Sequence, residues 1–298
     1  MARPAPGADR VVRVLDFLAA HPDDRFTLSE LARRLELNKA TAHALLVTLT
    51  DSGYLLRHPT DMTYSLGPAL IALGSAAQGR FPTVDFARDV MRSLSEELGL
   101  EVLASAAVDW EIVILARAGT PLPLGASVPL GQRLPIVPPI GSVFVAWAAD
   151  DEVDEWLRRV GPDTKPAELH HHRASLEAIR ERGYAVTLEA DAREQLGDAL
   201  AQLAEDARAA KVRGVIEQVI AELSHEEYLL GDLDRSGAYR VNTMGAPVFG
   251  PDGDVVLALF LVGFRGRLTG AEVEDHGQRL LQATRTVTKS LHGVEPIA

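Results

Sequence analysis

A fixed succession of short apolar patterns in residues 1–66 constrains the fold more than any other feature of the chain. Apolar residues recur at helical spacing within Val11–Ala19, which predicts a first helix. Thr27 and Glu30 have the spacing of a capping box, so a second helix is predicted to begin there. This helix is expected to run to about Leu35 and to be followed by a short turn.

A third helix is predicted to begin after Asn38, whose side chain can cap it, and to end near Gly53. Its apolar positions from Ala42 to Leu49 form one stripe, which is expected to be buried. Small and polar residues lie off that stripe, on the side that the major groove of DNA would meet. The candidate DNA contacts of this helix are Asn38, Lys39, Ala40, Thr41, His43, Ala44 and Thr48.

Two short strand patterns, Tyr54–Leu56 and Thr63–Leu66, follow the third helix and are separated by turn-forming residues. They predict a β-hairpin wing, from which Arg57, His58 and Tyr64 are further candidate DNA contacts. Three helices and a wing in this order predict a winged helix-turn-helix over residues 1–66 that binds double-stranded DNA. The alternative is that the same fold serves as a protein-interaction module.

The charge distribution permits such a division of the chain. The net charge is −12, yet residues 1–66 hold eight basic and eight acidic side chains, so all the excess acid lies later. An acidic body would be repelled from DNA while a neutral head could approach it. The chain contains no cysteine, which excludes disulfides and thiolate metal sites. No apolar run is long enough to cross a membrane, so a cytoplasmic location is expected.

The remaining residues predict a linker helix at 67–82 and an α+β domain at 83–298. Gly67-Pro68 opens the linker, because proline is favoured in the first turn of a helix. Strands and helices are expected to alternate in the larger domain. The predicted strands are 101–108, 112–116 and 255–262, and the predicted helices are 83–98, 150–159, 173–182 and 271–291.

The segment TLSELARRLELNKATAHALLVTLTDSG, from Thr27 to Gly53, and the following YLLRHPTDMTYSLGPALIALG resemble the DNA-binding region of IclR-type transcription regulators. The resemblance implies a winged helix-turn-helix joined through a linker helix to a GAF-like effector domain with an antiparallel sheet and flanking helices. It also implies self-association as a dimer or tetramer. No cofactor is expected. The family usually has arginine where this chain has Ala44, which implies a different operator.

The resemblance extends to an effector pocket for a small molecule. Leu134-Pro135-Ile136 and Ile140-Gly141-Ser142 resemble the loop and helix start that line the pocket in the family. Family members that sense small oxoacids carry a cysteine and two serines at positions that correspond to Thr243, Phe260 and Val262 here. The candidate effector contacts are therefore Ile136, Ile140, Gly141, Ser142, Thr243, Phe260 and Val262.

The chemistry of these positions favours an apolar or aromatic effector. A small carboxylate needs several convergent donors, because an unpaired buried charge is costly, and Phe260 and Val262 supply none. The alternative is that these two side chains fill the cavity and that no effector binds. Residues 189–237 are longer than the usual connection at this point in the family and are interpreted as an insertion. Their apolar stripes predict two amphipathic helices, which could cover the pocket, form an oligomer contact or pack on the core.

The strongest hint of enzymatic chemistry is the run His170-His171-His172, since imidazole is a common metal ligand. Adjacent histidines rarely converge on one ion, so the run is interpreted as a solvated loop before a helix, with no metal bound. The chain has no phosphate-binding glycine loop and no G-x-S-x-G nucleophile elbow. The prediction is therefore a regulator and not an enzyme, with a metal-dependent enzyme or ligand-binding protein as the alternative.

Overall fold

The computed structural model describes residues 5–21, 24–78, 82–120, 130–161, 164–189 and 228–296. The chain divides into two compact units, and the first boundary along the sequence lies between residues 81 and 82. We refer to the part of the first unit up to residue 78 as the head and to the unit that begins at residue 82 as the sheet domain.

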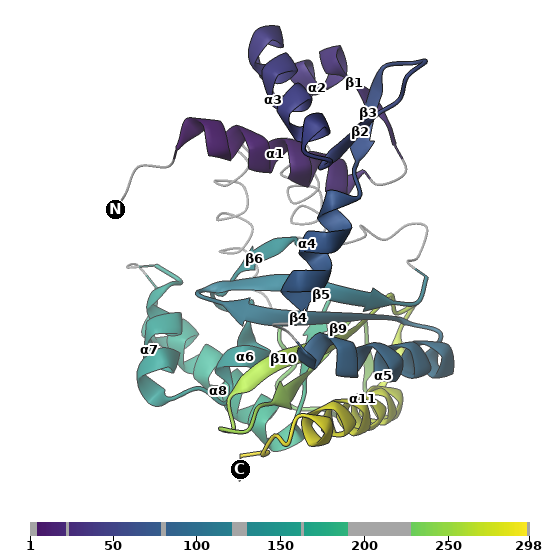
Figure 1. The fold of residues 1–298 in the computed structure, drawn as a ribbon. Coiled ribbons are helices and arrows are strands. Elements are labelled where there is room, and N and C mark those ends of the chain that lie inside the picture. Colours follow the sequence, from purple (N-terminus) through teal and green to yellow (C-terminus); the bar gives the residue numbers. More distant parts are fainter. Residues whose placement is uncertain are drawn as a thin grey trace. The chain divides into compact units, whose positions relative to one another are not determined.

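The head is a winged helix-turn-helix, as the sequence predicts (Figure 1). Its elements are α1 (Pro6–Ala20), β1 (Phe26–Thr27), α2 (Leu28–Arg34), α3 (Lys39–Asp51), β2 (Leu55–Arg57), β3 (Thr63–Leu66) and α4 (Ala69–Gln78). The strands form an antiparallel sheet in the order β1-β3-β2. Strand β1 is too short to leave a periodic pattern in the sequence and was not predicted.

Local side-chain chemistry sets the helix starts in the head. Thr27 and Glu30 form the predicted capping box: the Glu30 N–H donates to the Thr27 hydroxyl, and the Thr27 N–H donates to the Glu30 carboxylate at 2.8 Å. The Asn38 side chain accepts a hydrogen bond of 2.8 Å from the Thr41 N–H and caps α3. Both helices therefore begin where their capping residues predict.

The sheet domain contains a six-stranded antiparallel sheet in the order β6-β5-β4-β10-β9-β7. Its strands are β4 (Glu101–Val108), β5 (Glu111–Ala118), β6 (Arg133–Pro135), β7 (Ala185–Leu188), β9 (Val241–Phe249) and β10 (Val255–Val262). Strands β8 (Ala238–Tyr239) and β11 (Leu268–Thr269) form a separate pair. The three predicted strands and the antiparallel arrangement are confirmed.

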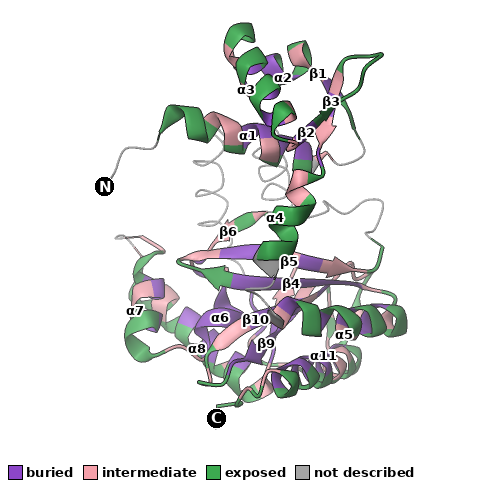
Figure 2. Cartoon of the chain, in the orientation of Figure 1, coloured by how far each residue is buried: buried purple, intermediate pink, exposed green. Residues whose placement is uncertain are grey.

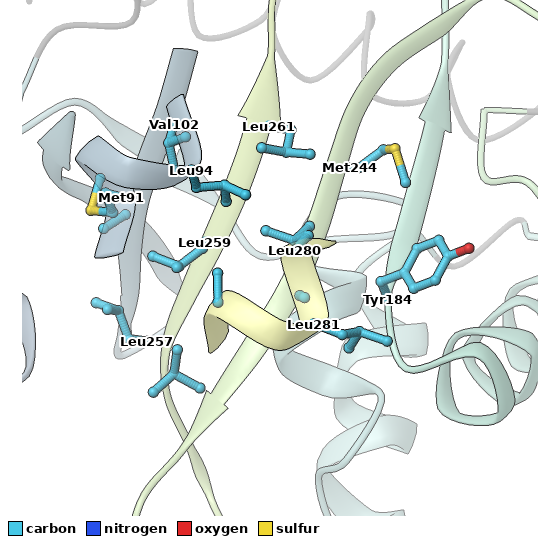
Figure 3. Packing of buried hydrophobic residues seen from close by; sticks show 14 of the residues in the cluster. Met91, Leu94, Val102, Tyr184, Met244, Leu257, Leu259, Leu261, Leu280 and Leu281 are labelled. Carbon is cyan, nitrogen blue, oxygen red and sulfur yellow. The ribbon is translucent and has the colours of Figure 1, made fainter. Parts of the chain in front are cut away.

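Two long helices cover one face of the sheet. Helix α5 (Pro82–Leu98) and helix α11 (Gly270–Ser290) pack against each other and against strands β4, β5, β9 and β10. Figure 3 shows the resulting core, in which side chains from both helices meet alternate residues of β10. Its labelled members include Met91, Leu94, Leu257, Leu259, Leu261 and Leu280, each no more than 4% exposed. Burial of this apolar surface holds the layers together.

A second apolar cluster lies on the opposite face and belongs to shorter helices. These are α6 (Ser142–Val145), α7 (Asp150–Arg158) and α8 (Pro166–Arg182). Trp156 of α7 is fully buried, and its indole N–H donates to the Ile140 carbonyl at 3.1 Å. Phe260 of β10 packs against the same cluster. This face carries the residues that the sequence assigns to the effector pocket.

The histidine run departs from its prediction. It lies inside α8, which begins at Pro166, and His172 is only 2% exposed. The His172 ring meets the ring of Trp156 edge to face, with 5.9 Å between centroids. Because His172 shares a helix side with Leu176 and Ile179, it faces the core, so the predicted solvated loop is wrong.

Within the described ranges, no group of three or more His, Asp or Glu side chains is placed to hold a metal ion. In the same part of the chain, no helix is long and apolar enough to span a bilayer. The two helices expected in the insertion at residues 189–237 fall mainly outside the described residues.

Candidate DNA-binding and effector sites

Helix α3 has exposed residues along one side (Figure 2), and most of the predicted DNA contacts are among them. Six of them are exposed: Asn38, Lys39, Ala40, His43, Ala44 and Thr48. Thr41 is half-buried, and its N–H is taken by the Asn38 cap. Ala42, Leu46 and Leu49 are buried on the inner side. The helix therefore has one anchored side and one free side, as a recognition helix requires.

The turn that precedes α3 is held by an arginine that sequence reasoning missed. Arg13 of α1 is only 5% exposed, and its guanidinium donates to the Leu35 carbonyl at 2.8 Å. The Leu37 N–H donates to the Ala32 carbonyl at 2.8 Å, and Glu36 adopts a positive φ of 51° in the same turn. A charged residue on the apolar side of a helix is the signal that could have identified Arg13.

The wing differs from its prediction at one position. Arg57 and His58 are exposed, but Tyr64 is only 3% exposed and belongs to the core of the head. The Arg57 guanidinium lies 5.9 Å from the centroid of the Tyr64 ring. Burial therefore removes the Tyr64 side chain from the surface that could meet DNA, and its ring supports Arg57 instead.

The turn of the wing is fixed by a carboxylate. Asp61 accepts hydrogen bonds from the hydroxyl of Thr63 at 2.7 Å and from its N–H at 3.2 Å, and these lower the pKa of the Asp61 carboxyl. The His58 Nδ1 atom lies 2.9 Å from the same carboxylate. Because Asp61 holds the His58 ring, it determines where this candidate DNA contact is presented.

In the sheet domain, the three predicted effector positions on strands share one face. Val262 pairs with Thr243 on β9 and with Glu101 on β4, and Phe260 pairs with Gly245. Paired residues of an antiparallel sheet project to the same side. A Cβ atom at Gly245 would lie 2.5 Å from the Phe260 ring, so glycine leaves the space that the ring occupies beside β9.

The predicted loop and helix start come together beside this face. Gly141 has a φ of 86°, and a Cβ atom there would lie 2.8 Å from the Ile136 side chain. Ser142 begins α6 and is 5% exposed. Ile136, Ile140 and Phe260 belong to one apolar cluster. The fold thus joins the predicted loop residues to Phe260, although they are far apart in the sequence.

Besides Thr243, this face carries polar groups that sequence reasoning missed: Thr187, Glu101, Arg117 and Ser105. The Thr187 and Thr243 hydroxyls form a hydrogen bond of 2.8 Å. The Arg117 guanidinium donates to the Glu101 carboxylate, with 2.8 Å between Nε and Oε1. The Ser105 hydroxyl is fully buried and has no hydrogen-bond partner among the described residues. These residues come from strands whose pairing the sequence alone does not specify.

Comparisons with known proteins agree with this arrangement. A family model described as the IclR helix-turn-helix domain matches residues 7–59. The glycerol operon regulatory protein of Streptomyces griseus is 30% identical over 201 residues, which cover 63% of this chain and 75% of that protein. The chain belongs to the IclR family.

Another relative is the HTH-type transcriptional regulator XynR of Escherichia coli, 28% identical over 186 residues that cover 61% of this chain and 73% of that protein. The fold also matches the crystal structure of an IclR homologue from Microbacterium hydrocarbonoxydans complexed with 4-hydroxybenzoate. The TM-score is 0.59 and the identity 20%, and the match covers 96% of this chain and 98% of that one.

Family membership settles the class of protein. The chain is a sequence-specific DNA-binding transcription regulator, and relatives such as XynR are HTH-type transcriptional regulators. The family consists of regulators, so neither the metal-dependent enzyme nor the interaction-module alternative is supported.

Proposed function

We propose that α3 enters the major groove of operator DNA while the wing reaches the phosphate backbone. The observation that carries this proposal is the outer side of α3, where exposed Lys39 and His43 stand beside the small side chains of Ala40 and Ala44. Small residues allow the helix axis to approach the base edges, and polar ones can bond to them. Arg57 and His58 on the wing would contact phosphates, which position the head without reading sequence.

The test uses fragments of operator DNA selected from random sequence by the full-length protein. The double substitution Lys39→Ala/Thr41→Ala should weaken binding about tenfold or more in fluorescence anisotropy titrations, because it removes a phosphate or base contact and a polar group of the groove side. Lys289→Ala is the matched control, since Lys289 is also exposed but lies on α11. Equal affinity of the double variant and the wild type would contradict this assignment of α3.

On the effector side, the proposed ligand is an apolar or aromatic small molecule. Phe260 and Val262 present hydrocarbon, the Thr243 hydroxyl is bonded to Thr187, and the Arg117 charge is balanced by Glu101. A small oxoacid would therefore find few free donors, and burying its charge would be costly. The buried Ser105 hydroxyl can serve a polar substituent on an aromatic ring. The 4-hydroxybenzoate bound by the Microbacterium homologue likewise carries a hydroxyl on an aromatic ring.

Calorimetric titration would decide between the two ligand classes. Neutral hydroxylated aromatics such as phenol and catechol should bind, glyoxylate and pyruvate should not, and Phe260→Ser should lose aromatic binding because it removes the apolar contact. Val108→Ser is the matched control, since Val108 ends β4 and is 36% exposed. Tight binding of glyoxylate that Phe260→Ser abolishes would contradict the apolar site.

Each predicted domain is assigned its own function in this proposal. Residues 1–66 are proposed to bind DNA, residues 67–82 to link, and residues 83–298 to bind the effector and to self-associate. Two heads of a dimer, or of a tetramer built from dimers, would then read a pseudo-palindromic operator in the cytoplasm. An effector can regulate them only if it binds two arrangements of the heads with different affinity. Sedimentation equilibrium tests the assembly, and a monomer at micromolar concentration would contradict it.

A further inference from the structure

A cavity lies at one end of the sheet, in the sheet domain alone. Its volume is about 460 Å³, which is within the range of small-molecule pockets, roughly 300–1,000 Å³. The turn between β4 and β5, the turn between β9 and β10, and the connection from α6 to α7 form its walls. Six of the lining residues are either acidic or tryptophan: Asp109, Trp110, Trp147, Glu152, Asp252 and Asp254.

The charge of the lining is all of one sign. Its four charged residues are the carboxylates, and neither lysine nor arginine is part of the lining. Within the described part of the chain, none of these carboxylates forms an ion pair, although many other surface carboxylates do. A cleft lined by one sign of charge concentrates counter-ions of the opposite sign. The cavity therefore favours a cation.

The aromatic residues indicate what kind of cation would fit. The faces of indole rings attract positive charge and also offer a large apolar area. The chain already uses this interaction beside the cavity, because the Arg159 guanidinium lies 4.0 Å from the centroid of the Trp110 ring. Trp147 meets Phe249 edge to face, with 5.5 Å between centroids, which fixes the orientation of its ring.

A bare metal ion does not suit this arrangement. No three acidic or histidine side chains of the described residues are grouped closely enough to hold one ion. The carboxylates come from separate turns and a helix start, so they surround a volume and do not converge on a point. We propose that this cavity binds a small organic ammonium ion, whose charge is spread over a larger radius and whose methyl or methylene groups can pack on Trp147.

The proposed site is distinct from the aromatic effector face but touches the same loop. Ile136 lines the cavity and also packs against Gly141, where α6 begins. The other predicted effector residues, among them Thr243, Phe260 and Val262, do not line this cavity. An ammonium ligand would therefore be a second, independent signal, and its binding does not depend on the proposed aromatic effector.

The test uses the full-length protein and choline as the probe. Trp110 and Trp147 line the cavity, whereas the third tryptophan, Trp156, is fully buried. Choline should therefore change the tryptophan fluorescence in a saturable way, and added salt should weaken its binding. The uncharged analogue 3,3-dimethylbutan-1-ol has the same shape and should bind at least about tenfold more weakly, because it lacks the cation–π attraction and the carboxylate attraction.

Variants measured by calorimetry complete the test. Glu152→Gln/Asp252→Asn should weaken choline binding about threefold to tenfold, and Trp147→Leu about tenfold. Asp151→Asn is the matched control, because Asp151 lies in the same first turn of α7 but outside the cavity, and it should bind choline normally. Equal binding of choline and its neutral analogue, unchanged affinity of the carboxylate variant, or binding of Ca²⁺ in place of choline would each overturn the proposal.

Discussion

In the head, most candidate contacts come from one helix of 13 residues, α3, and its capping Asn38. On the effector side, the candidate contacts come from a loop, a helix start and two strands between Ile136 and Val262. The first set is positioned by helical periodicity, which is a local property of the chain. The second set exists only after the sheet has formed, because strand pairing brings its members together. Substitutions within one helix can therefore test the head, whereas the effector side must be tested by substitutions that disturb the packing between strands.

The largest expected effect comes from the inner side of α3. Leu46 is 1% exposed, and Leu46→Ala should destabilise the head by about 2–5 kcal/mol, because it leaves a cavity in the core. DNA binding should fall with it, as measured by anisotropy alongside thermal unfolding. The neighbouring Val47→Ala is the control, since Val47 is 40% exposed and its loss should change stability by less than about 0.5 kcal/mol. Similar unfolding temperatures for the two variants would show that α3 is not anchored as described.

The sheet domain offers the corresponding test through packing. Gly245→Ala should displace the Phe260 ring and cost about 1–3 kcal/mol, since the added methyl group would lie 2.5 Å from that ring. Calorimetry should also show a loss of aromatic ligand binding. Gly74→Ala is the control, because a methyl group at Gly74 meets no atom within 4 Å and alanine favours a helix. An unchanged unfolding temperature and ligand affinity for Gly245→Ala would mean that the Phe260 ring is free to move.

The two capping boxes give a smaller effect, and one lies in each unit. Thr27 caps the 7-residue helix α2, and Thr269 caps the 21-residue helix α11 in the same way. Thr→Ala at either position should cost about 1 kcal/mol, whereas Thr→Ser should retain the cap. Hydrogen exchange should show that Thr27→Ala loosens all of α2, because its single capped end is a large share of a short helix. Loss of protection throughout α11 in Thr269→Ala would contradict this dependence on length.

The smallest effect is a dependence on pH in the head. Hydrogen bonds from the N–H and hydroxyl of Thr27 lower the pKa of the Glu30 carboxyl in the folded state. The stabilisation is therefore complete above the ordinary pKa of glutamate, about 4.3, and is lost as the pH falls through the lowered folded-state value. The difference in stability between wild type and Glu30→Gln should shrink from pH 7 to about pH 3. Glu36→Gln is the control, because Glu36 is also an exposed glutamate of the head. A stability difference between wild type and Glu30→Gln that grows in acid would contradict the predicted direction of the pH dependence.

Local chemistry in the sequence determined the order of elements in the head and the points where they begin. Thr27 and Asn38 mark helix starts because their side chains satisfy backbone N–H groups within three residues. The apolar stripe of α3 likewise predicts which side is buried, since helical periodicity is independent of the rest of the chain. The strands at 101–108 and 255–262 were predictable because each is a short, nearly continuous apolar run.

Tertiary structure alone decided which polar side chains are buried and which distant residues meet. The sequence placed Tyr64 on the DNA-binding surface and His172 in solvent, yet both are buried, because the packing of neighbouring elements decides their exposure. Packing between distant segments also decided three features that the sequence does not show. These are the hydrogen bond from Arg13 to Leu35, the Glu101–Arg117 ion pair and the burial of the Ser105 hydroxyl. The cavity beside Trp110 and Trp147 has the same origin, since no local pattern records that two hairpin turns and a helix start will enclose one volume.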